Sequence, residues 1–457
     1  MRDERPERKA DSAPTGCGEP PYPPAGYSWY VVFLLLAIYT FSFIDRQILA
    51  LLVGPIKRDL ALSDFAFSLL SGFAFAVFYT VFGLPFARIA DSRSRRGLIA
   101  FGVAFWSLAT AACGVTKVYW HLLIARIGVG VGEATLSPAA NSLIADYFPK
   151  EKLGRALSVY SLGIPIGSAM AFILGGAVVA AIEDLPVQDL PVIGRLYGWQ
   201  IAFFVVGLPG LALALMMVTV KEPFRRGRLS AGAGRAGLPL GNVAAFLRSH
   251  GRAYAALFLG PAFLSALGYG GTLWMIAFYT RTHGLAASEA GLLFGGVLAV
   301  FGTGGILLGG ALADRLSARG RADGPMRVLL WAAILMLPTG VAYPLAPDAL
   351  SATLLLCLST LASNMPWGTA YAAIAAITPN EMRGQAAAVY LFIVNLIGLG
   401  AGPSIIAAFT DYVYASEAML NYAMATATGL LTPIAALLFA LGLKPYARAM
   451  AAADARG

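Results

Sequence analysis

Apolar runs of about 20 residues recur along the chain from Trp29 onward, and short polar breaks separate them. A helix needs about 20 apolar residues to cross ~30 Å of hydrocarbon, so each run predicts one membrane span. The break between the fifth and sixth runs, EDLPVQDLPVIGRLYG, is rich in Pro and predicts an outer loop. The runs predict twelve spans, at 29–53, 66–89, 97–116, 119–142, 155–182, 199–220, 254–281, 287–313, 326–345, 350–377, 385–409 and 420–443.

Composition agrees with an all-α polytopic membrane protein. Of the 457 residues, 58% are hydrophobic and 12% are charged, whereas a soluble domain carries roughly 25% charged residues. The low charge excludes a soluble enzyme and a disordered scaffold. The net charge of +9 is spread between the apolar runs, which is typical of membrane anchoring and not of nucleic-acid binding. The cysteines, Cys17, Cys113 and Cys357, form no disulfide or metal pattern.

The distribution of Lys and Arg predicts the orientation. With the N-terminus in the cytoplasm, most of the 33 Lys and Arg residues lie in inner loops and tails, which the positive-inside rule favours. Residues 1–26 mix charge with Pro and Gly, so they predict a disordered cytoplasmic tail without a signal peptide. A second cytoplasmic tail is expected at 446–457, and the predicted location is a bacterial inner membrane. The outer loops hold the smaller set Lys57, Arg58, Lys117, Arg195 and Arg281.

Two parts of the chain repeat. The segment 146–160 recurs at 376–390 with a shift of 230 residues, and Ala90-Asp91 recurs as Ala313-Asp314. This duplication predicts six-helix bundles at 27–220 and 253–445, joined by a cytoplasmic linker at 221–252 with room for a short surface helix. Parallel six-span repeats of this kind place a site between the bundles near the bilayer midplane. The matching positions are Pro149, Glu151, Gly154, Ala156 and Tyr160 with Pro379, Glu381, Gly384, Ala386 and Tyr390.

Inner-loop residues resemble the Gly-x-x-x-Asp-Arg-x-x-Arg-Arg motif of the major facilitator superfamily. The second copy keeps the first half of the motif, whereas the first copy has Ala87 and Ser92 in the Gly and first Arg positions. The resemblance implies two pseudo-symmetric bundles that alternate access. It also implies a conformational latch at the cytoplasmic face, formed by Asp91, Arg95, Arg96, Asp314 and Arg315.

Further stretches resemble the Spinster branch of that superfamily, the sphingolipid and lysolipid transporters. They are FIDR at 43–46, RIGVGVGEA at 126–134, IADYFP at 144–149, and GWQ at 198–200 leading to GLPG at 207–210. In Spinster proteins the matching Asp, Arg and Glu are implicated in transport, which points to Asp45, Arg126 and Glu133 here.

Asp45, Arg46, Arg126 and Glu133 are the ionisable residues predicted well inside the spans. Each charge at the bilayer centre costs at least ~2.5–3.5 kcal/mol, so a function is expected. Arg126 and Glu133 lie seven residues apart and share a helix face, whereas the adjacent Asp45 and Arg46 point ~100° apart. We expect Asp45 and Glu133 to couple protons, and Arg126 to bind a phosphate or carboxylate. The alternative is a set of buried ion pairs that only holds helices together.

The second half carries no charge deep in its spans, so its cavity wall should be apolar or weakly polar. With the charged first half, this wall suits an amphiphile whose head meets Arg126. Ordinary helix packing is the alternative role for its aromatic and amide residues. The full set of expected substrate-binding residues is Arg126, Arg46, Tyr269, Trp274, Asn364, Trp367 and Asn395.

These features predict a secondary active transporter that works by alternating access, is coupled to protons and moves an amphiphile of the sphingolipid or lysophospholipid class. A multidrug or small organic-anion transporter is the alternative. A P-loop, a channel filter and a catalytic cluster are absent from the sequence, so an ATP-driven pump, a channel and an enzyme are disfavoured. The expected partners are the amphiphile, protons and membrane lipids, for a monomer without metal or cofactor.

Overall fold

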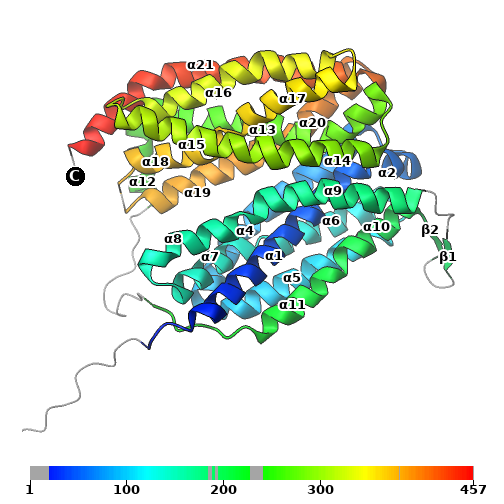
Figure 1. The fold of residues 1–457 in the computed structure, drawn as a ribbon, viewed down its shortest axis with the longest axis horizontal. Coiled ribbons are helices and arrows are strands. Elements are labelled where there is room, and N and C mark those ends of the chain that lie inside the picture. The colour runs from blue at the N-terminus through cyan, green and yellow to red at the C-terminus, as the bar shows by residue number, and fades with distance from the viewer. Residues whose placement is uncertain (1–19, 184–187, 191–193, 227–239, 380, 456–457) are drawn as a thin grey trace, which may run out of the picture.

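The computed structural model describes residues 20–183, 188–190, 194–226, 240–379 and 381–455. Twelve helices in this part of the chain are long and apolar enough to cross a membrane, which confirms the predicted number. They form two bundles, with α1–α11 in one and α13–α21 in the other (Figure 1). The protein is therefore an all-α integral membrane protein.

The N-terminal bundle contains the first six spans, several of which are broken into two helices. Its helices are α1 (Ala25–Leu51), α2 (Val53–Leu60), α3 (Asp64–Ser68), α4 (Ala74–Ser92), α5 (Arg95–Cys113), α6 (Tyr119–Glu133), α7 (Leu136–Tyr147), α8 (Lys150–Ser161), α9 (Gly163–Glu183), α10 (Gly198–Gly207) and α11 (Pro209–Thr219). A π-helical turn at Leu69–Phe73 joins α3 to α4.

The C-terminal bundle follows α12 (Leu240–Ser249), a helix in the linker between the bundles. Its helices are α13 (Gly251–His283), α14 (Ala287–Val297), α15 (Thr303–Ala318), α16 (Gly324–Ala342), α17 (Ala349–Asn364), α18 (Pro366–Ile377), α19 (Arg383–Ile393), α20 (Gly402–Ala408) and α21 (Leu420–Asp454). Wider π-helical turns lie at Leu298–Gly302, Val394–Ala401 and Phe409–Val413, and 3₁₀ turns lie at Tyr343–Leu345 and Glu417–Met419.

The duplication extends to the positions where helices break. The fourth span breaks before α7 at Leu136, and the tenth breaks before α18 at Pro366. These two starts are 230 residues apart, the same shift that relates the repeated sequence segments. The two halves thus share a local backbone feature as well as a sequence pattern.

The structure differs from the sequence expectations at several boundaries. The loop predicted at 183–198 contains a two-stranded antiparallel hairpin, β1 (Gln188–Leu190) and β2 (Gly194–Leu196), in which Gln188 pairs with Leu196. Gly194 has a φ of +74°, which a glycine adopts readily at such a turn.

Helix α1 begins inside the predicted N-terminal tail, and α21 continues through most of the predicted C-terminal tail. Residues 1–19 of the first tail and 227–239 of the linker lie outside the described residues.

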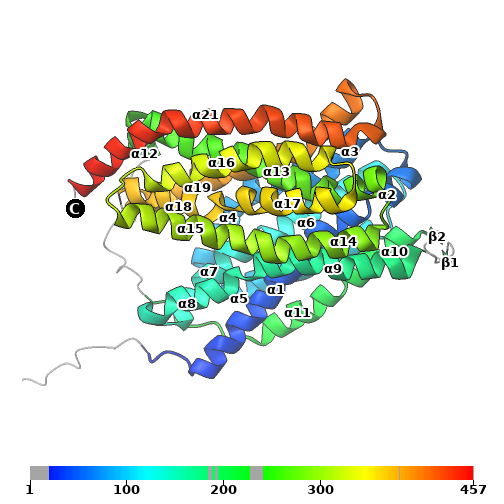
Figure 2. The same cartoon turned by 45° about the horizontal axis from the view of Figure 1, so that its top comes forward.

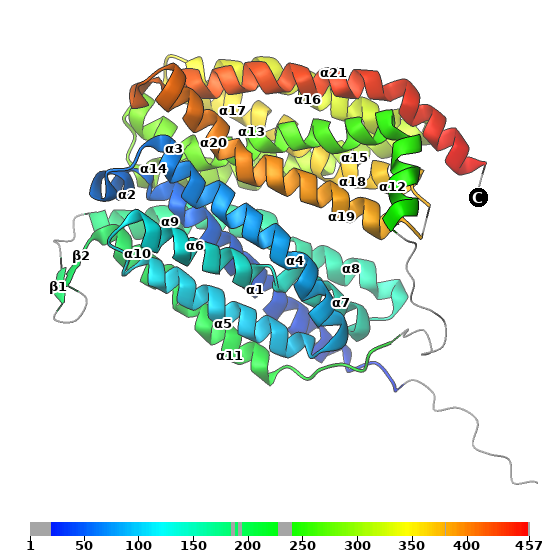
Figure 3. The same ribbon diagram turned by 180° about the vertical axis from the view of Figure 1, so that it is seen from behind.

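The two ends of the bundles differ in how the halves meet. We call the end where α1 begins and α21 finishes the terminal end, and the opposite end, with α2 and the hairpin, the distal end (Figure 1). Toward the terminal end the bundles spread apart, as the view from behind in Figure 3 also shows. Toward the distal end α14 lies along α9 (Figure 2), and α1 contacts α13.

An apolar seal closes the distal side between the halves. The Phe172 ring of α9 meets the Phe294 ring of α14 edge-on, with centroids 4.8 Å apart. A Cβ placed on Gly291 would lie 2.7 Å from the Phe172 carbonyl oxygen and 3.0 Å from a Leu51 methyl group. Glycine at this position therefore lets the backbones of the two halves approach closely.

Tight packing of α6 against its neighbours positions the charged residues that this helix carries. A Cβ on Gly132 would lie 2.7 Å from the Trp106 Cβ of α5, and one on Gly130 would lie 2.9 Å from the Phe75 carbonyl oxygen of α4. These distances leave no room for a side chain. Glycines between Arg126 and Glu133 thus give α6 a smooth surface, and the close packing fixes where these two charged residues lie.

We predict that Gly132→Ala destabilises the protein by about 1–3 kcal/mol, because the added methyl group overpacks the contact with Trp106. Gly154→Ala is the matched control, since a Cβ there meets nothing within 4 Å and alanine favours a helix by roughly 0.5–1 kcal/mol. Unfolding in detergent should place Gly132→Ala below the unaltered protein and Gly154→Ala at or above it. Equal stability of the two variants would contradict the close packing.

Candidate functional site

The four ionisable residues predicted inside the spans come together in the N-terminal bundle. Asp45 and Arg46 lie on α1, and Arg126 and Glu133 lie on α6. Asp45 and Glu133 are each 2% exposed and Arg126 is fully buried, whereas the Arg46 side chain keeps 9% of its surface exposed. We call these four residues the central charged group.

Arg46 pairs with Glu133 across α1 and α6. The Arg46 Nη2 donates to Glu133 Oε2 at 2.5 Å. The guanidinium carbon also lies 4.5 Å from the centroid of the Phe75 ring and 5.3 Å from that of Tyr79. A guanidinium over aromatic faces is stabilised by the ring quadrupoles in addition to its ion pair. The sequence placed Glu133 on the same face as Arg126, but its direct partner is Arg46.

Arg126 and Asp45 form the second part of the central charged group. The Arg126 Nη1 donates to the backbone carbonyl of Asp45 at 3.4 Å, and Thr110 Oγ1 donates to Asp45 Oδ2 at 3.3 Å. Asp45 thus points toward α5 while Arg46 points toward α6 and α4, which confirms that the two side chains diverge. Within the described chain, Asp45 Oδ1, Glu133 Oε1 and Arg126 Nε and Nη2 have no hydrogen-bond partner. The group therefore retains capacity to bind a proton or an anion.

Of the residues expected from the second half, Tyr269 interacts with the charge of Arg46 in the central charged group. It packs against the N-terminal cluster that includes Tyr39 and Tyr79, and Tyr79 in turn contacts Arg46. The Trp367 ring meets Tyr269 edge-on, with centroids 5.9 Å apart. Tyr269 and Trp367 thus form an aromatic wall opposite Arg46.

The side-chain hydrogen bonds of Asn364 and Trp274 lie within the C-terminal bundle. Asn364 Nδ2 donates to the Thr360 carbonyl of its own helix at 2.8 Å, and Asn395 lies in the π-helical segment Val394–Ala401. Trp274 is fully buried, and its indole donates to the Pro403 carbonyl at 3.0 Å. These contacts place Trp274 in helix packing in this conformation.

A network of ion pairs at the distal end joins the two halves. The Arg281 guanidinium of α13 binds both carboxylate oxygens of Asp64, at 2.7 and 2.9 Å, and Lys57 also donates to Asp64. Glu417, which precedes α21, lies 2.7 Å from the Lys57 Nζ and 3.3 Å from Arg281. We call these four residues the distal network. Sequence reasoning treated Lys57 and Arg281 only as outer-loop charges and missed the network.

Hydrogen bonds from neighbouring residues support the distal network. Ser68 Oγ donates to Ser404 Oγ at 3.0 Å, and the Phe65 backbone N–H donates to Asp411 Oδ2 at 2.8 Å. Each of these bonds links the N-terminal to the C-terminal bundle. The distal side is therefore held closed by polar contacts as well as by the apolar seal.

The residues expected to form a latch lie at the terminal end and make different contacts. Asp91 and Asp314 are exposed, and within the described chain no ion pair involves either carboxylate. Arg95 is 1% exposed and pairs with Asp146 and with Glu222, whose Oε1 lies 2.8 Å from Nε. Arg95 thus ties the fourth span and the linker to its own bundle.

Arg96 also contacts the start of the linker. Its Nη1 donates to the Val220 carbonyl at 3.0 Å, and its backbone N–H donates to Glu222 Oε2 at 3.0 Å. Partial burial acts to raise the pKa of Glu222, but the hydrogen bonds from Arg95, Arg96 and Ser94 outweigh it and hold that pKa below its usual value. Asp146 and Glu222 are therefore structural partners that the latch motif alone did not reveal.

Comparison with known proteins identifies the family. The family model for the Major Facilitator Superfamily matches residues 35–403. The chain belongs to the Major Facilitator Superfamily. It is a transporter of this superfamily and is related both to Spinster proteins and to efflux pumps.

Relatives and solved structures agree with this assignment. An MFS-type efflux pump of Mycolicibacterium smegmatis is 31% identical over 391 residues, which cover 84% of this chain and 85% of that protein. Protein spinster homolog 1 of Xenopus tropicalis is 26% identical over 420 residues, covering 86% and 74% of the two chains. The crystal structure of a bacterial homologue of the human lysosomal transporter Spinster, inward-facing and unoccupied, matches with a TM-score of 0.76 and 28% identity, covering 94% of this chain and 98% of that one. These matches confirm the Spinster-like resemblance.

We predict that Asp64→Asn loosens the distal side of this transporter, because the amide loses the charge that binds Arg281 from the other half. The reporter is Ser68→Cys, a fully buried position, in a variant whose native cysteines are replaced. A membrane-impermeant maleimide should label it about tenfold faster with Asp64→Asn, the effect expected from losing a bidentate ion pair.

The matched control for this labelling is Asp59→Asn. Asp59 accepts a 2.7 Å hydrogen bond from the Trp199 indole within the N-terminal bundle, so it does not join the halves. Equal labelling rates with Asp64→Asn and Asp59→Asn would contradict a closing role for the distal network.

Proposed function

We propose that this transporter moves a single-chain, lipid-like amphiphile with an anionic head, of the sphingolipid or lysophospholipid class, in exchange for or together with protons. The observation that carries the proposal is the Arg46–Glu133 pair on the side of the N-terminal bundle that faces Tyr269. A cation held there by a carboxylate can exchange that carboxylate for the anionic head of a substrate.

Exposure favours Arg46 over Arg126 as the direct contact for the head. Arg126 is fully buried against α1, whereas Arg46 keeps 9% of its side-chain surface exposed. A guanidinium binds a phosphate or carboxylate through two parallel hydrogen bonds, so Arg46 suits the anionic head. Arg126 then positions Asp45 and balances its charge behind Arg46.

The same pair supports coupling to protons. When a substrate anion takes Arg46, Glu133 loses its partner in an apolar surrounding, and a proton then neutralises the carboxylate. When the substrate leaves, Glu133 releases the proton and pairs with Arg46 again. Substrate and proton thus bind opposite members of one ion pair, so that binding of one favours binding of the other, and Asp45 is placed to act in the same way beside Arg126.

The orientation proposed for this cycle puts the terminal end in the cytoplasm. The loops and tails at that end carry most of the Lys and Arg residues, as the positive-inside rule requires. In the described conformation the distal network and the apolar seal then close the outer side. The location that follows is a bacterial inner membrane, with both termini inside.

A second candidate is export of drugs or small organic anions. It is favoured by the identity to the MFS-type efflux pump of Mycolicibacterium smegmatis. The aromatic wall of Tyr269 and Trp367 would suit a flat apolar ring as well as an acyl chain.

Transport assays in proteoliposomes separate the two candidates. A lysophospholipid, a cationic drug and an aromatic organic acid are each offered with and without a pH gradient. We expect gradient-dependent transport of the lysophospholipid. Transport of the drug or the acid, with none of the lysophospholipid, would replace the first proposal by the second.

We predict that Glu133→Gln abolishes the response of transport to a pH gradient, because the amide keeps the shape of the side chain but cannot carry a proton. Purified Glu133→Gln protein should remain folded in detergent. The matched control is Glu289→Gln, an exposed position whose carboxylate caps α14. A full response to the gradient in Glu133→Gln would place the coupling elsewhere, with Asp45 as the next residue to replace.

A further inference from the structure

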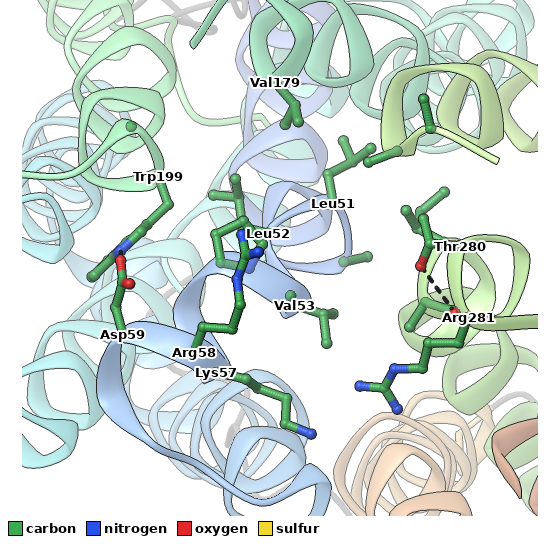
Figure 4. Close-up of a pocket in the computed structure, with 18 of the residues that line it drawn as sticks. Leu51, Leu52, Val53, Lys57, Arg58, Asp59, Val179, Trp199, Thr280 and Arg281 are labelled. Carbon is green, nitrogen blue, oxygen red and sulfur yellow. Dashed lines mark hydrogen bonds between the residues drawn. The ribbon is translucent and has the colours of Figure 1, made fainter. Parts of the chain in front are cut away.

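A cavity of about 700 Å³ lies at the distal end, between the two halves (Figure 4). Its volume falls within the roughly 300–1,000 Å³ typical of small-molecule sites. Residues from α1, α2, α9 and α13 line it, so both bundles contribute. We call it the distal pocket.

The walls of the distal pocket are apolar on one side. Leu51 and Leu52 at the end of α1, Val179 of α9 and Ile276 of α13 face it (Figure 4 labels the first three). Leu51 also belongs to the apolar seal, because its methyl group contacts Gly291. The distal pocket therefore lies against the seal, on the side away from the terminal end.

Cations gather on the other side of the distal pocket. Figure 4 shows Lys57 and Arg281 reaching toward one another from opposite sides, while Arg58 extends from α2 toward Leu52. Lys57 and Arg281 are neutralised by Asp64 and Glu417 in the distal network.

Arg58 differs from the other two cations. The neighbouring acid, Asp59, is already held by the Trp199 indole. Within the described chain, Arg58 has no hydrogen-bond or ion-pair partner, although it lines the pocket. Its guanidinium is therefore available to bind an anion next to an apolar wall.

We propose that the distal pocket is a second binding site for a single-chain amphiphile with an anionic phosphate or carboxylate head. The head binds Arg58, and the chain lies against Leu52 and Val179. This inference rests on the proposed function. It places a second binding site for the same substrate class on the opposite side of the apolar seal from the central charged group.

The chemistry of the pocket distinguishes this ligand from others. A cationic amphiphile would meet a lining that holds three cations and two carboxylates, so its head is less favoured there than an anionic one. A neutral one would gain the apolar wall but would make no charge-assisted contact with Arg58, whose side chain is exposed. Free phosphate would gain the contact with Arg58 but would use none of the apolar wall.

Photo-crosslinking of the full-length protein in phosphatidylcholine nanodiscs tests the proposal. The probe is lysophosphatidic acid with a diazirine at the end of its acyl chain, and labelled peptides are mapped by mass spectrometry. We expect labelling within 50–62, 179–182 and 276–287, at the distal pocket. Arg58→Gln should lower that labelling about tenfold, the loss expected for a charge-assisted contact, while Arg58→Lys should restore part of it.

The control variant is Arg195→Gln, which removes an exposed arginine of the hairpin at the same end without lining the pocket. It should label as the unaltered protein does. A monoacylglycerol probe with the same chain, which lacks the phosphate, should label only as well as Arg58→Gln does. Excess inorganic phosphate should leave the lysophosphatidic acid labelling in place, since labelling that it abolished would show a site for the free anion and overturn the proposal.

The position of the label separates this proposal from the proposed function. Labelling of the distal peptides in a protein that transports no amphiphile supports the second site and overturns the transport proposal. Labelling confined to 39–46 and 126–133, around the central charged group, overturns the second site and supports the transport proposal. Distal labelling that Arg58→Gln leaves unchanged also overturns the second site, and labelling at neither place overturns both.

Discussion

The pairing of Arg46 with Glu133 inside an apolar bundle is the constraint on which the rest of the arrangement depends. A charge so deeply buried is tolerated only when a partner of opposite charge lies within hydrogen-bond distance, so the side chains of Arg46 on α1 and Glu133 on α6 must meet at this level. Close approach of α6 is possible because Gly130 and Gly132 carry no side chain where α4 and α5 press against it. The small residues of α6 thus help to hold Glu133 where Arg46 of another helix can reach it.

Stability alone does not explain why these charges are present. A buried ion pair is often no more stable than a well-packed apolar pair of similar volume, because both groups lose their hydration. Glu133 Oε1 and two nitrogen atoms of Arg126 also lack hydrogen-bond partners within the described chain, which adds to the cost. A charged group with unused hydrogen-bonding capacity, facing an aromatic wall, is better explained as a binding site than as a fastening between helices.

Periodicity in the sequence predicted the spans and the duplication well, since both depend on patterns within the chain. The break before Leu136 and its counterpart before Pro366 follow the same shift as the sequence repeat. The partner of Glu133 could not be predicted in this way, because the rotation of α1 relative to α6 decides whether Arg46 reaches it. The distal network was missed for a related reason, since Asp64 and Arg281 are 217 residues apart and meet only when the bundles dock.

The distal network also affects how readily the distal side of the two bundles opens. Glu417 keeps 58% of its side-chain surface exposed and Arg281 keeps 17%, so these groups lie at the edge of water and can be hydrated as they separate. Asp64 is fully buried, so its carboxylate depends on Lys57 and Arg281 for stabilisation. When the halves part, Lys57 remains with Asp64 because both belong to the N-terminal bundle, and Asp64 loses only its bond to Arg281. One buried charge thus keeps a partner in both arrangements, which lowers the electrostatic cost of moving between them.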